Sequence, residues 1–484
     1  MRRAVFTLRV GGAALAALAC TLIGCQVGPN YHPPPLPAGA DAPLVSLDAT
    51  LETTAVPPDR WWRLYNDAQL DALVREALLA NRDLRAADAN LTAARAVVTA
   101  VHAARYPSTE AIAGGVYGRD PVTNEILEIG GHRPQTLWLF EDLFEVAYEV
   151  DLYGRVHRAI EQANANADSV AATRDGVRVF IAAQTARGYA EICALGEQLG
   201  VARHSLEIVS NQAEITQQRF NAGQGSEFDV ERARALVDQV SATVPQLSGL
   251  RSVALFEVTA LLGRAPANAP RELDSCAAPP RLPVPIPVGD GRSLISRRPD
   301  VRQAERRLAA STARIGVATA DLYPTIRLSA FYGGTGTEVS QLSTNAGLSW
   351  GVGPAISWTF PNQVRARAQI RQAKAGQEAA LATFDSAVLT ALKETEQALT
   401  TYRAALEQHQ ALVRAQARIH RSFNIARDQF AAGSLSPLDL LATEQSLVAL
   451  DAAVAASDSM LIEDQISTFK ALGGGWQNDT SSAR

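Results

Sequence analysis

Apolar side chains recur three and four positions apart along most of the chain, the spacing of an amphipathic α-helix. The first such run begins after Trp61, continues past Asn81 and stops at Tyr106-Pro107. A proline disfavours helical geometry in the residue before it. The pattern therefore predicts one helix that runs through Asn81 and ends at Arg105.

The chain carries the signs of an internal duplication. A second helical run opens at Arg298-Pro299-Asp300 and again stops at a Tyr-Pro pair. The matching landmarks are Asp83 and Asp300, Tyr106 and Tyr323, each 217 residues apart, and the Phe-x-Ala-Gly segments 220–223 and 430–433, which are 210 residues apart. This period is far too long for a short solenoid repeat, so we expect two copies of one structural unit.

Each repeat contains a proline-free helical stretch of unusual length, 155–222 in the first and 363–432 in the second. At 1.5 Å per residue each would extend ~100 Å if it were continuous. Each stretch is followed by a glycine, Gly223 or Gly433. Glycine best tolerates the left-handed conformation in which helices commonly end, so we expect both helices to stop there.

A returning helix is predicted after each glycine, at 227–262 and 437–472. Pro437 suits the first turn of its helix. Pro245 lies inside the other helix, and we expect it to kink or break that helix. Small and apolar residues recur three and four apart, which indicates coiled-coil-like packing between the long helices.

Between the helices, the pattern changes to the alternation of β-strands. The clearest segment is 348–360, where only Pro354 breaks the alternation; 144–151 alternates Phe, Val and Tyr with acidic and small residues. Weaker partners lie near 109–117 and 325–332. A soluble hairpin with one buried face gives the same pattern. Lengths near the ~9–11 residues of a membrane-spanning strand, and aromatics near the strand ends, favour the membrane.

Four membrane strands would have a consequence for assembly. Four strands cannot close a barrel, and an open sheet edge cannot lie in lipid, where no water satisfies the backbone groups. If the strands span a membrane, the chain must oligomerise: two chains would supply eight strands and three would supply twelve. The acidic and small side chains would then line a water-filled lumen.

The N-terminus has the layout of an export signal over residues 1–24. Arg2 and Arg3 precede an apolar stretch, 10–23, that is too short to span a membrane. It ends in Leu-Ile-Gly-Cys25, which resembles the lipobox of bacterial lipoproteins and implies a lipid on Cys25; a cysteine beside an ordinary cleavage site is the alternative. Gln26 follows, which by the same resemblance favours the outer membrane. The proline-rich stretch 25–60 predicts an extended arm.

Charge and motifs exclude several classes of function. The formal charge is −5, and removal of the three arginines in residues 1–24, which hold no acid, leaves −8. No long basic run remains, which argues against a nucleic-acid partner. No CxxC or HxxxH spacing is present, so no zinc site or other metal site is predicted. Without HExxH or a P-loop, we expect no enzyme and no cofactor beyond the lipid.

Two further cysteines, Cys193 and Cys276, lie one in each half of the chain. Two thiols in an oxidising compartment can pair. The sequence leaves both a disulfide and two separate thiols open.

These motifs together resemble the outer-membrane efflux protein family typified by TolC, in its lipidated NodT or OprM branch, which serves resistance–nodulation–division (RND) pumps. The segments that carry the resemblance are 25–31 (CQVGPNY), Trp61-Trp62, Asn81-x-Asp83, 151–155 (DLYGR), 220–223 (FNAG), 261–263 (LLG) and 298–300 (RPD). The resemblance implies a homotrimer in the cell outer membrane, with a twelve-stranded β-barrel, four strands per chain, on a long α-helical coiled-coil tunnel. It also implies a periplasmic membrane-fusion adaptor and an inner-membrane RND pump as partners, with passive conduction of drugs or other small molecules.

The family closes its periplasmic end with side chains near the hairpin tips. Asp439 falls on an acidic position of that motif, whereas Ala442 stands at a second position that is acidic in relatives. Asp229 and Glu227 occupy the first-repeat tip. Acids in the first turn of a helix also stabilise the helix dipole, so a gate and a local stabilising role are both open for Asp439, and the stabilising role is favoured for the other two.

The resulting division of the chain has six parts. They are a signal peptide at 1–24, a lipidated arm at 25–60, a first repeat at 61–275, a proline-rich linker at 276–291, a second repeat at 292–475 and a tail at 476–484. Two rival functions remain. A type I protein-secretion duct would share the helices and strands, but the lipobox favours small-molecule efflux, because TolC, which the family resemblance brings in, has no lipid anchor. A lipid-anchored periplasmic coiled-coil scaffold would share the lipobox and the helices but not the strands.

Overall fold

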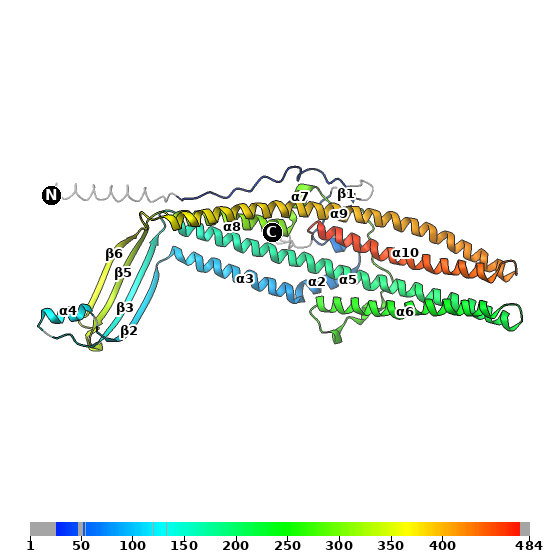
Figure 1. Ribbon diagram of the computed structural model, residues 1–484, viewed down its shortest axis with the longest axis horizontal. Helices are drawn as coiled ribbons and strands as arrows, with labels where there is room; N and C mark the ends of the chain where they lie inside the picture. The colour runs from blue at the N-terminus through cyan, green and yellow to red at the C-terminus, as the bar shows by residue number, and fades with distance from the viewer. Residues whose placement is uncertain (1–25, 47–51, 54, 120, 132, 475–484) are drawn as a thin grey trace. The chain divides into compact units, whose positions relative to one another are not determined.

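The computed structural model describes residues 26–46, 52–53, 55–119, 121–131 and 133–474. The predicted signal, Cys25 and the predicted tail lie outside these residues. The longer elements are α2 Ala68–Ala80, α3 Arg82–His102, β2 Ser108–Gly118, α4 Pro121–Ile129, β3 Leu137–Val150, α5 Arg155–Asn221, α6 Glu227–Leu261, α8 Pro299–Ala320, β5 Thr325–Gly336, β6 Leu348–Ser357, α9 Val364–Ala431 and α10 Pro437–Ala471 (Figure 1). The shorter ones are β1 Glu52–Thr53, η1 Trp61–Tyr65, η2 Ala103–Arg105, η3 Pro266–Asn268, η4 Arg271–Ser275, β4 Ile286–Pro287, α7 Gly291–Arg297 and η5 Val339–Gln341.

Two compact units are each assembled from both halves of the sequence. The first comprises the described parts of Met1–Pro34, Thr92–Ser169 and Ala304–Thr383, and contains the four long strands. The second comprises the described parts of Pro35–Leu91, Val170–Gln303 and Phe384–Arg484, and contains both returning helices and the greater part of both long helices.

The internal duplication is confirmed by the order of the elements. Each half runs helix, strand, strand, long helix and returning helix: α3, β2, β3, α5 and α6, then α8, β5, β6, α9 and α10. The long helices have 67 and 68 residues, and the returning helices have 35 each. The mainly helical fold with a four-stranded sheet therefore follows the sequence pattern, and the short parallel pair β1-β4 is an addition that the pattern did not predict.

The predicted continuous helix through Asn81 is wrong. Asn81 has extended backbone geometry, with φ −61° and ψ 135°, and separates α2 from α3. Its side-chain oxygen accepts hydrogen bonds from the amides of Asp83 and Leu84, at 2.9 and 3.1 Å. An asparagine that caps a new helix in this way satisfies amides that otherwise lack a partner, so the helical periodicity continues while the axis is interrupted. Arg298 holds the corresponding place between α7 and α8.

The long helices end as predicted. Gly223 and Gly433 have φ of 72° and 77°. The amide of Gln224 donates to the carbonyl of Arg219 at 2.8 Å, and that of Ser434 donates to the carbonyl of Gln429 at 2.9 Å. This backbone pattern with a left-handed glycine is a Schellman motif.

Pro245 does not break its helix. α6 continues through it to Leu261. Proline removes one helical hydrogen bond and leaves the carbonyl four residues earlier, that of Ser241, without its donor. Pro245 is exposed and Ser241 is partly exposed, so water can satisfy that carbonyl, and packing on the other face of the helix holds the turn together.

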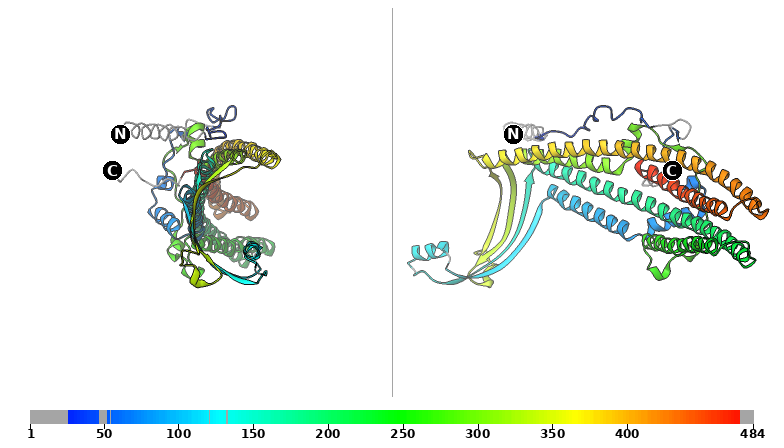
Figure 2. Two further views of the ribbon diagram at one scale, coloured as in Figure 1. Left: turned by 90° about the vertical axis from the view of Figure 1, so that its left-hand side faces the viewer. Right: turned by 45° about the vertical axis from the view of Figure 1, so that its right-hand side comes forward.

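The four predicted strands form one antiparallel sheet in the order β2-β3-β5-β6, which Figure 2 shows as strongly curved. β6 ends at Ser357 and not at Phe360, because Ser357 pairs with Thr325, the first residue of β5. Pro354 lies inside β6. It is tolerated because β6 is an edge strand, where an amide on the outer side has no partner in the sheet. The short helix α4, between β2 and β3, was not predicted.

The core of the second unit gathers around Trp61. Its ring stacks on Phe469 at 4.8 Å between centroids, with Tyr65 edge-on to both rings and Trp62 edge-on to Trp61. The hydroxyl of Tyr65 donates to Gln465 of α10 at 3.2 Å. The aromatic residues that open the first repeat are thus buried against the last helix of the second.

Among the described helices, α10 is the one whose length and composition would allow it to cross a membrane. Its place in the duplication argues for a different role, because it matches α6 in length and in position after the long helix. It also carries buried polar side chains that bond to α9: Asp451 accepts from His420 at 2.8 Å and from Gln416 at 2.9 Å. We therefore assign α10 to the helical hairpin.

Candidate functional site

One face of the sheet is apolar across three strands. Phe144, Tyr332 and Trp350 lie directly opposite one another on β3, β5 and β6. They are 50, 61 and 68% exposed, and Val352 and Ile356 on the same face of β6 are each 70% exposed. We call this the apolar face. Large aromatic and aliphatic side chains exposed in rows on strands are typical of a lipid-facing surface.

The opposite face carries acids among small residues. Glu145 lies opposite Glu110 on β2, and Glu149 lies opposite Arg327 on β5. Gly351 and Gly353 supply small positions on β6. We call this the acidic face, although apolar residues such as Phe331 also lie on it. Its charges suit a water-filled lumen, because ionised groups are costly in lipid.

The two outer strands of the sheet each have one unpaired edge. β2 pairs only with β3, and β6 pairs only with β5. The rows of backbone amides and carbonyls on the outer sides of these strands therefore have no strand partner in the sheet of one chain. Such edges are templates for pairing with another chain.

Aromatic pairs lie where the strands meet the long helices. Tyr153 and Tyr323 stack at 4.5 Å between ring centroids, and Trp358 stacks on Phe360 at 4.7 Å. The indole nitrogen of Trp358 donates to the carbonyl of Leu322 at 3.0 Å. Amphipathic rings at strand ends are the pattern of a membrane–water interface.

The described start of the arm is clamped to the first turns of α5. Arg158 is buried, and its guanidinium donates to the carbonyls of Val27 and Gly28 at 3.2 and 3.3 Å, and to the side chain of Asn30 at 2.7 Å. The amide of Val27 donates to the carbonyl of Tyr153 at 3.2 Å. The residues that directly follow Cys25 are thereby fixed beside the strand–helix junction, while Cys25 itself lies outside the described residues.

The tip acids lie in the first turns of the returning helices. In α6, Asp229 accepts from the hydroxyl of Ser226 at 2.6 Å, and its amide donates back to that hydroxyl at 3.2 Å. In α10, Asp439 and Ser436 make the same two bonds, at 2.7 and 3.1 Å. Ser-Asp pairs of this spacing cap a helix N-terminus. Glu227 is exposed in the same first turn as Asp229.

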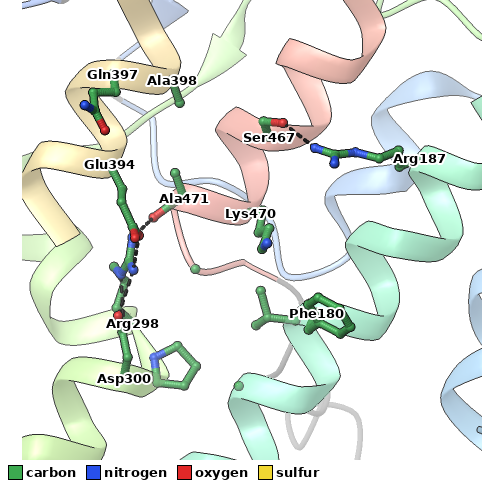
Figure 3. Close-up of a pocket in the computed structure, with 14 residues that line it drawn as sticks. Phe180, Arg187, Arg298, Asp300, Glu394, Gln397, Ala398, Ser467, Lys470 and Ala471 are labelled. Atoms are coloured by element: carbon green, nitrogen blue, oxygen red, sulfur yellow. Dashed lines mark hydrogen bonds and ion pairs between the residues drawn. The ribbon is translucent and has the colours of Figure 1, made fainter. Parts of the chain in front are cut away.

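Arg298 is a site residue whose role the sequence did not reveal. Although the Arg-Pro-Asp motif marked a helix start, the buried guanidinium joins three segments of chain. It pairs with Asp300 at 2.7 Å and with Glu394 of α9 at 2.6 Å, and donates to the carbonyl of Ala471 at 2.8 Å (Figure 3). With all these partners in place, the motif works as a structural clamp.

The clamp borders an open cavity of about 390 Å³ in the second unit (Figure 3). Across the cavity, Arg187 of α5 donates to Ser467 of α10 at 2.7 Å, and the Lys470 ammonium lies 5.3 Å from the centre of the Phe180 ring. Within the part of the chain that the structure describes, no group of three or more His, Cys, Asp or Glu side chains is arranged to hold a metal ion. The arrangement offers mixed charges and no catalytic constellation.

The structure joins Cys193 and Cys276 in a disulfide, with 4.8 Å between their Cα atoms. Cys193 is buried in α5, and Cys276 follows η4. Arg251 of α6 donates to the carbonyl of Cys276 at 2.7 Å. The bond therefore fastens the segment after the first hairpin back onto the middle of the long helix.

Comparisons with known proteins find relatives that share this combination of strands and long helices. The model of the family described as outer membrane efflux protein matches residues 73–264 and 291–474. The solved outer-membrane channel OprN is 34% identical, covers 94% of this chain and 100% of its own, and superposes with a TM-score of 0.85.

Two curated relatives extend over nearly the whole chain. The toluene efflux pump outer membrane protein TtgC of Pseudomonas putida is 28% identical over 97% of this chain and 96% of its own length. The probable outer membrane lipoprotein SilC of Salmonella typhimurium is 26% identical over 94% and 96%. The two matched stretches of the family model together span both sequence repeats, with their long helices and their strands. The chain is thus a member of the outer membrane efflux protein family.

Proposed function

We propose that three copies of this chain form the outer-membrane channel of a tripartite efflux system, which conducts drugs or other small molecules passively to the exterior. The observation that carries the proposal is the four-stranded sheet, which has one apolar face, one acidic face and two unpaired edges. Three copies would join β2 of one chain to β6 of the next and close a twelve-stranded barrel, which leaves no open sheet edge in lipid.

A lipid anchor on Cys25 belongs to the same proposal. The clamp on Val27 and Asn30 supports it, because it holds the residues after Cys25 at the strand–helix junction, where aromatic rings mark the membrane surface. The name of SilC, a probable outer membrane lipoprotein, is a second support.

The partners are inferred from the relatives. Names such as toluene efflux pump outer membrane protein place TtgC in a pump assembly. By analogy, we propose an inner-membrane RND pump and a periplasmic adaptor that contacts the helical tips, where Phe228 and Leu438 are 68 and 50% exposed. Asp439, at the tip of the second repeat, is proposed to narrow the periplasmic opening of the tunnel. Asp229 and Glu227, at the tip of the first repeat, are included in this proposed gate.

We propose no enzymatic role and no cofactor other than the lipid. The spacing Gly-x-Ser-x-Gly at 347–351 matches a hydrolase nucleophile motif in sequence, but it leads into the edge strand β6. The hydrolase motif requires a sharp turn from a strand into a helix.

The first experiment is detergent extraction of the outer-membrane fraction, followed by the intact mass of the complex, in parallel with Cys25→Ala. We expect a mass of three mature chains, each increased by its lipid, and loss of the lipid mass in the variant. A soluble monomer or dimer without membrane association would reject the barrel and leave a periplasmic scaffold.

A second measurement separates efflux from type I protein secretion. Deletion of the chain should raise sensitivity to small toxic compounds and leave the set of secreted proteins unchanged. Loss of one exported protein with unchanged drug sensitivity would assign the duct to secretion.

A further inference from the structure

A carboxyl group is buried without a partner near the tips of the helical hairpins. Glu444 lies in the second turn of α10 and is 1% exposed. Its Oε1 has no hydrogen-bond partner, and no ion pair to this side chain is formed by the residues that the structure describes. An unpaired buried carboxylate is strongly unfavourable, so a group in this position takes the neutral form.

The surroundings of Glu444 come from three helices. It lines a small cavity with Gln212 and Thr216 of α5, and with Asp229 and Arg232 of α6. On its own helix, Leu440 and Leu447, at i−4 and i+3, are buried against a cluster that includes Phe430 of α9, over whose ring the Arg219 guanidinium lies at 3.9 Å. The charged groups that face this region are therefore Asp229, Arg232 and Arg219.

None of these charges compensates a Glu444 carboxylate. Asp229 is of the same sign and is bonded to Ser226. The guanidinium of Arg232 lies 5.5 Å from the centre of the Phe228 ring. Burial raises the pKa of the Glu444 carboxyl to about 8. Because the site is enclosed by helices of one protomer, assembly into an oligomer would not expose it.

We propose that Glu444 is a proton-operated latch: its neutral carboxyl lets α10 pack against α5 and α6 near the tips, and its ionisation loosens that packing. If the chain forms the proposed tunnel, on which this step rests, the latch would make the opening of the tunnel tip depend on pH. Arg232 lines the same cavity, and is the cation available to a carboxylate that moves out of the packed position.

The direction of the pH dependence follows from linkage. The pKa of Glu444 in the packed state, about 8, lies above the ordinary value of 4.5 that the carboxyl regains in water. The packed state therefore holds a proton that the loosened state releases. The contribution of Glu444 to packing is complete below pH 4.5 and is lost as the pH rises from there through about 8.

The test measures the distance between the two hairpin tips in full-length, lipidated protein in nanodiscs. Ala222→Cys and Ala432→Cys place spin labels at matching exposed positions that follow the two long helices. The native pair Cys193–Cys276 is oxidised and does not react with the label. Co-expression with an excess of unlabelled chain limits each oligomer to one labelled protomer, so that pulsed electron resonance reads an intrachain distance.

We expect the distance distribution to be narrow at pH 5 and to become longer and broader by pH 9, with the change falling between the two pKa values, 4.5 and about 8. Glu444→Gln, which keeps the size and removes the charge, should retain the narrow distribution at both pH values. Glu444→Leu gives a second neutral variant in case the amide finds a new partner. Glu214→Gln neutralises an exposed acid in the last turns of α5 that has no part in the proposed tip gate, and should behave like the unsubstituted chain.

A distribution that does not change with pH in the unsubstituted chain would overturn the latch, as would an equal shift in Glu444→Gln. The native mass of the same samples tests the proposed function separately. If the chain is not trimeric, the proposed duct fails, while the intrachain distance still decides whether Glu444 controls the packing of the hairpins.

Discussion

At the scale of single residues, the arm is held by an interlock between glycines and one buried arginine. Gly28 has φ of +89°, and a Cβ built on it would lie 2.5 Å from the Cα of Gly316. A Cβ on Gly316 would in turn lie 2.7 Å from the Cγ of Arg158. The three residues leave no room for a side chain at either glycine, so the clamp requires both.

This interlock predicts that Gly28→Ala releases the arm. An L-residue in the left-handed region costs about 1–2 kcal/mol, and the backbone contact with Gly316 adds to it. We expect chymotrypsin to cleave after Tyr31 about tenfold faster, which corresponds to about 1.4 kcal/mol. Gly39→Ala is the matched control, because Gly39 has φ of +79° but nothing within 4 Å of its Cβ position. Equal cleavage in the two variants would mean that the contact with Gly316 does not hold the arm.

At the scale of helices and strands, most of the fold could be predicted because two periodicities dominate the sequence. The long helices and all four strands follow from them, as do the helix ends at Gly223 and Gly433. The break at Asn81 could not be seen, since capping replaces the lost backbone bonds without disturbing the apolar spacing. α4 is too short to establish a period.

Some residues of the candidate site could be predicted from the sequence, and others could not. Asp439 was found because it falls on an acidic position of the family motif, and Asp229 because it lies in the first turn of the returning helix predicted after Gly223. Arg158, Arg298 and Glu444 were missed, because their roles depend on contacts with segments far away in the sequence. Nothing in the neighbouring residues of α10 marks Glu444 as buried.

The two faces of the sheet predict opposite results for adjacent substitutions in β6. Val352→Lys places a charge on the apolar face and should cost ~2–4 kcal/mol in lipid, so we expect loss of the assembled trimer from the outer membrane. Gly353→Lys points to the acidic face, where nothing lies within 4 Å of its Cβ position, and assembly should persist. The measurement is the amount of heat-resistant trimer in membrane fractions. Assembly of both variants would contradict a lipid-facing apolar side.

At the scale of the whole molecule, the proposed trimer would carry three copies of each tip acid around one passage. A carboxylate about 7 Å from a passing cation attracts it by ~0.6 kcal/mol in water. Asp439 can attract passing cations, or it can only cap the N-terminus of α10. Substitutions of Asp439 and Ser436 separate these roles, because both residues take part in the cap but only Asp439 is charged.

We expect Asp439→Asn to lower the preference for cations over anions by roughly two- to threefold, from the attraction estimated above. Ser436→Ala should loosen the first turn of α10 by about 1 kcal/mol and leave the ion preference unchanged. Reversal potentials across a salt gradient in planar bilayers give the preference, and amide hydrogen exchange gives the stability of the turn. Unchanged selectivity in Asp439→Asn would assign Asp439 to the helix cap alone.

The disulfide has a consequence for the order in which the molecule is made. Both of its cysteines, Cys193 and Cys276, precede the second repeat in the chain. Export delivers the N-terminal part first, so an oxidant can close this covalent loop while the second half is still being threaded across the inner membrane. The first hairpin would then be folded and covalently closed before α9 and α10 are exported, and these helices would pack against it as they emerge.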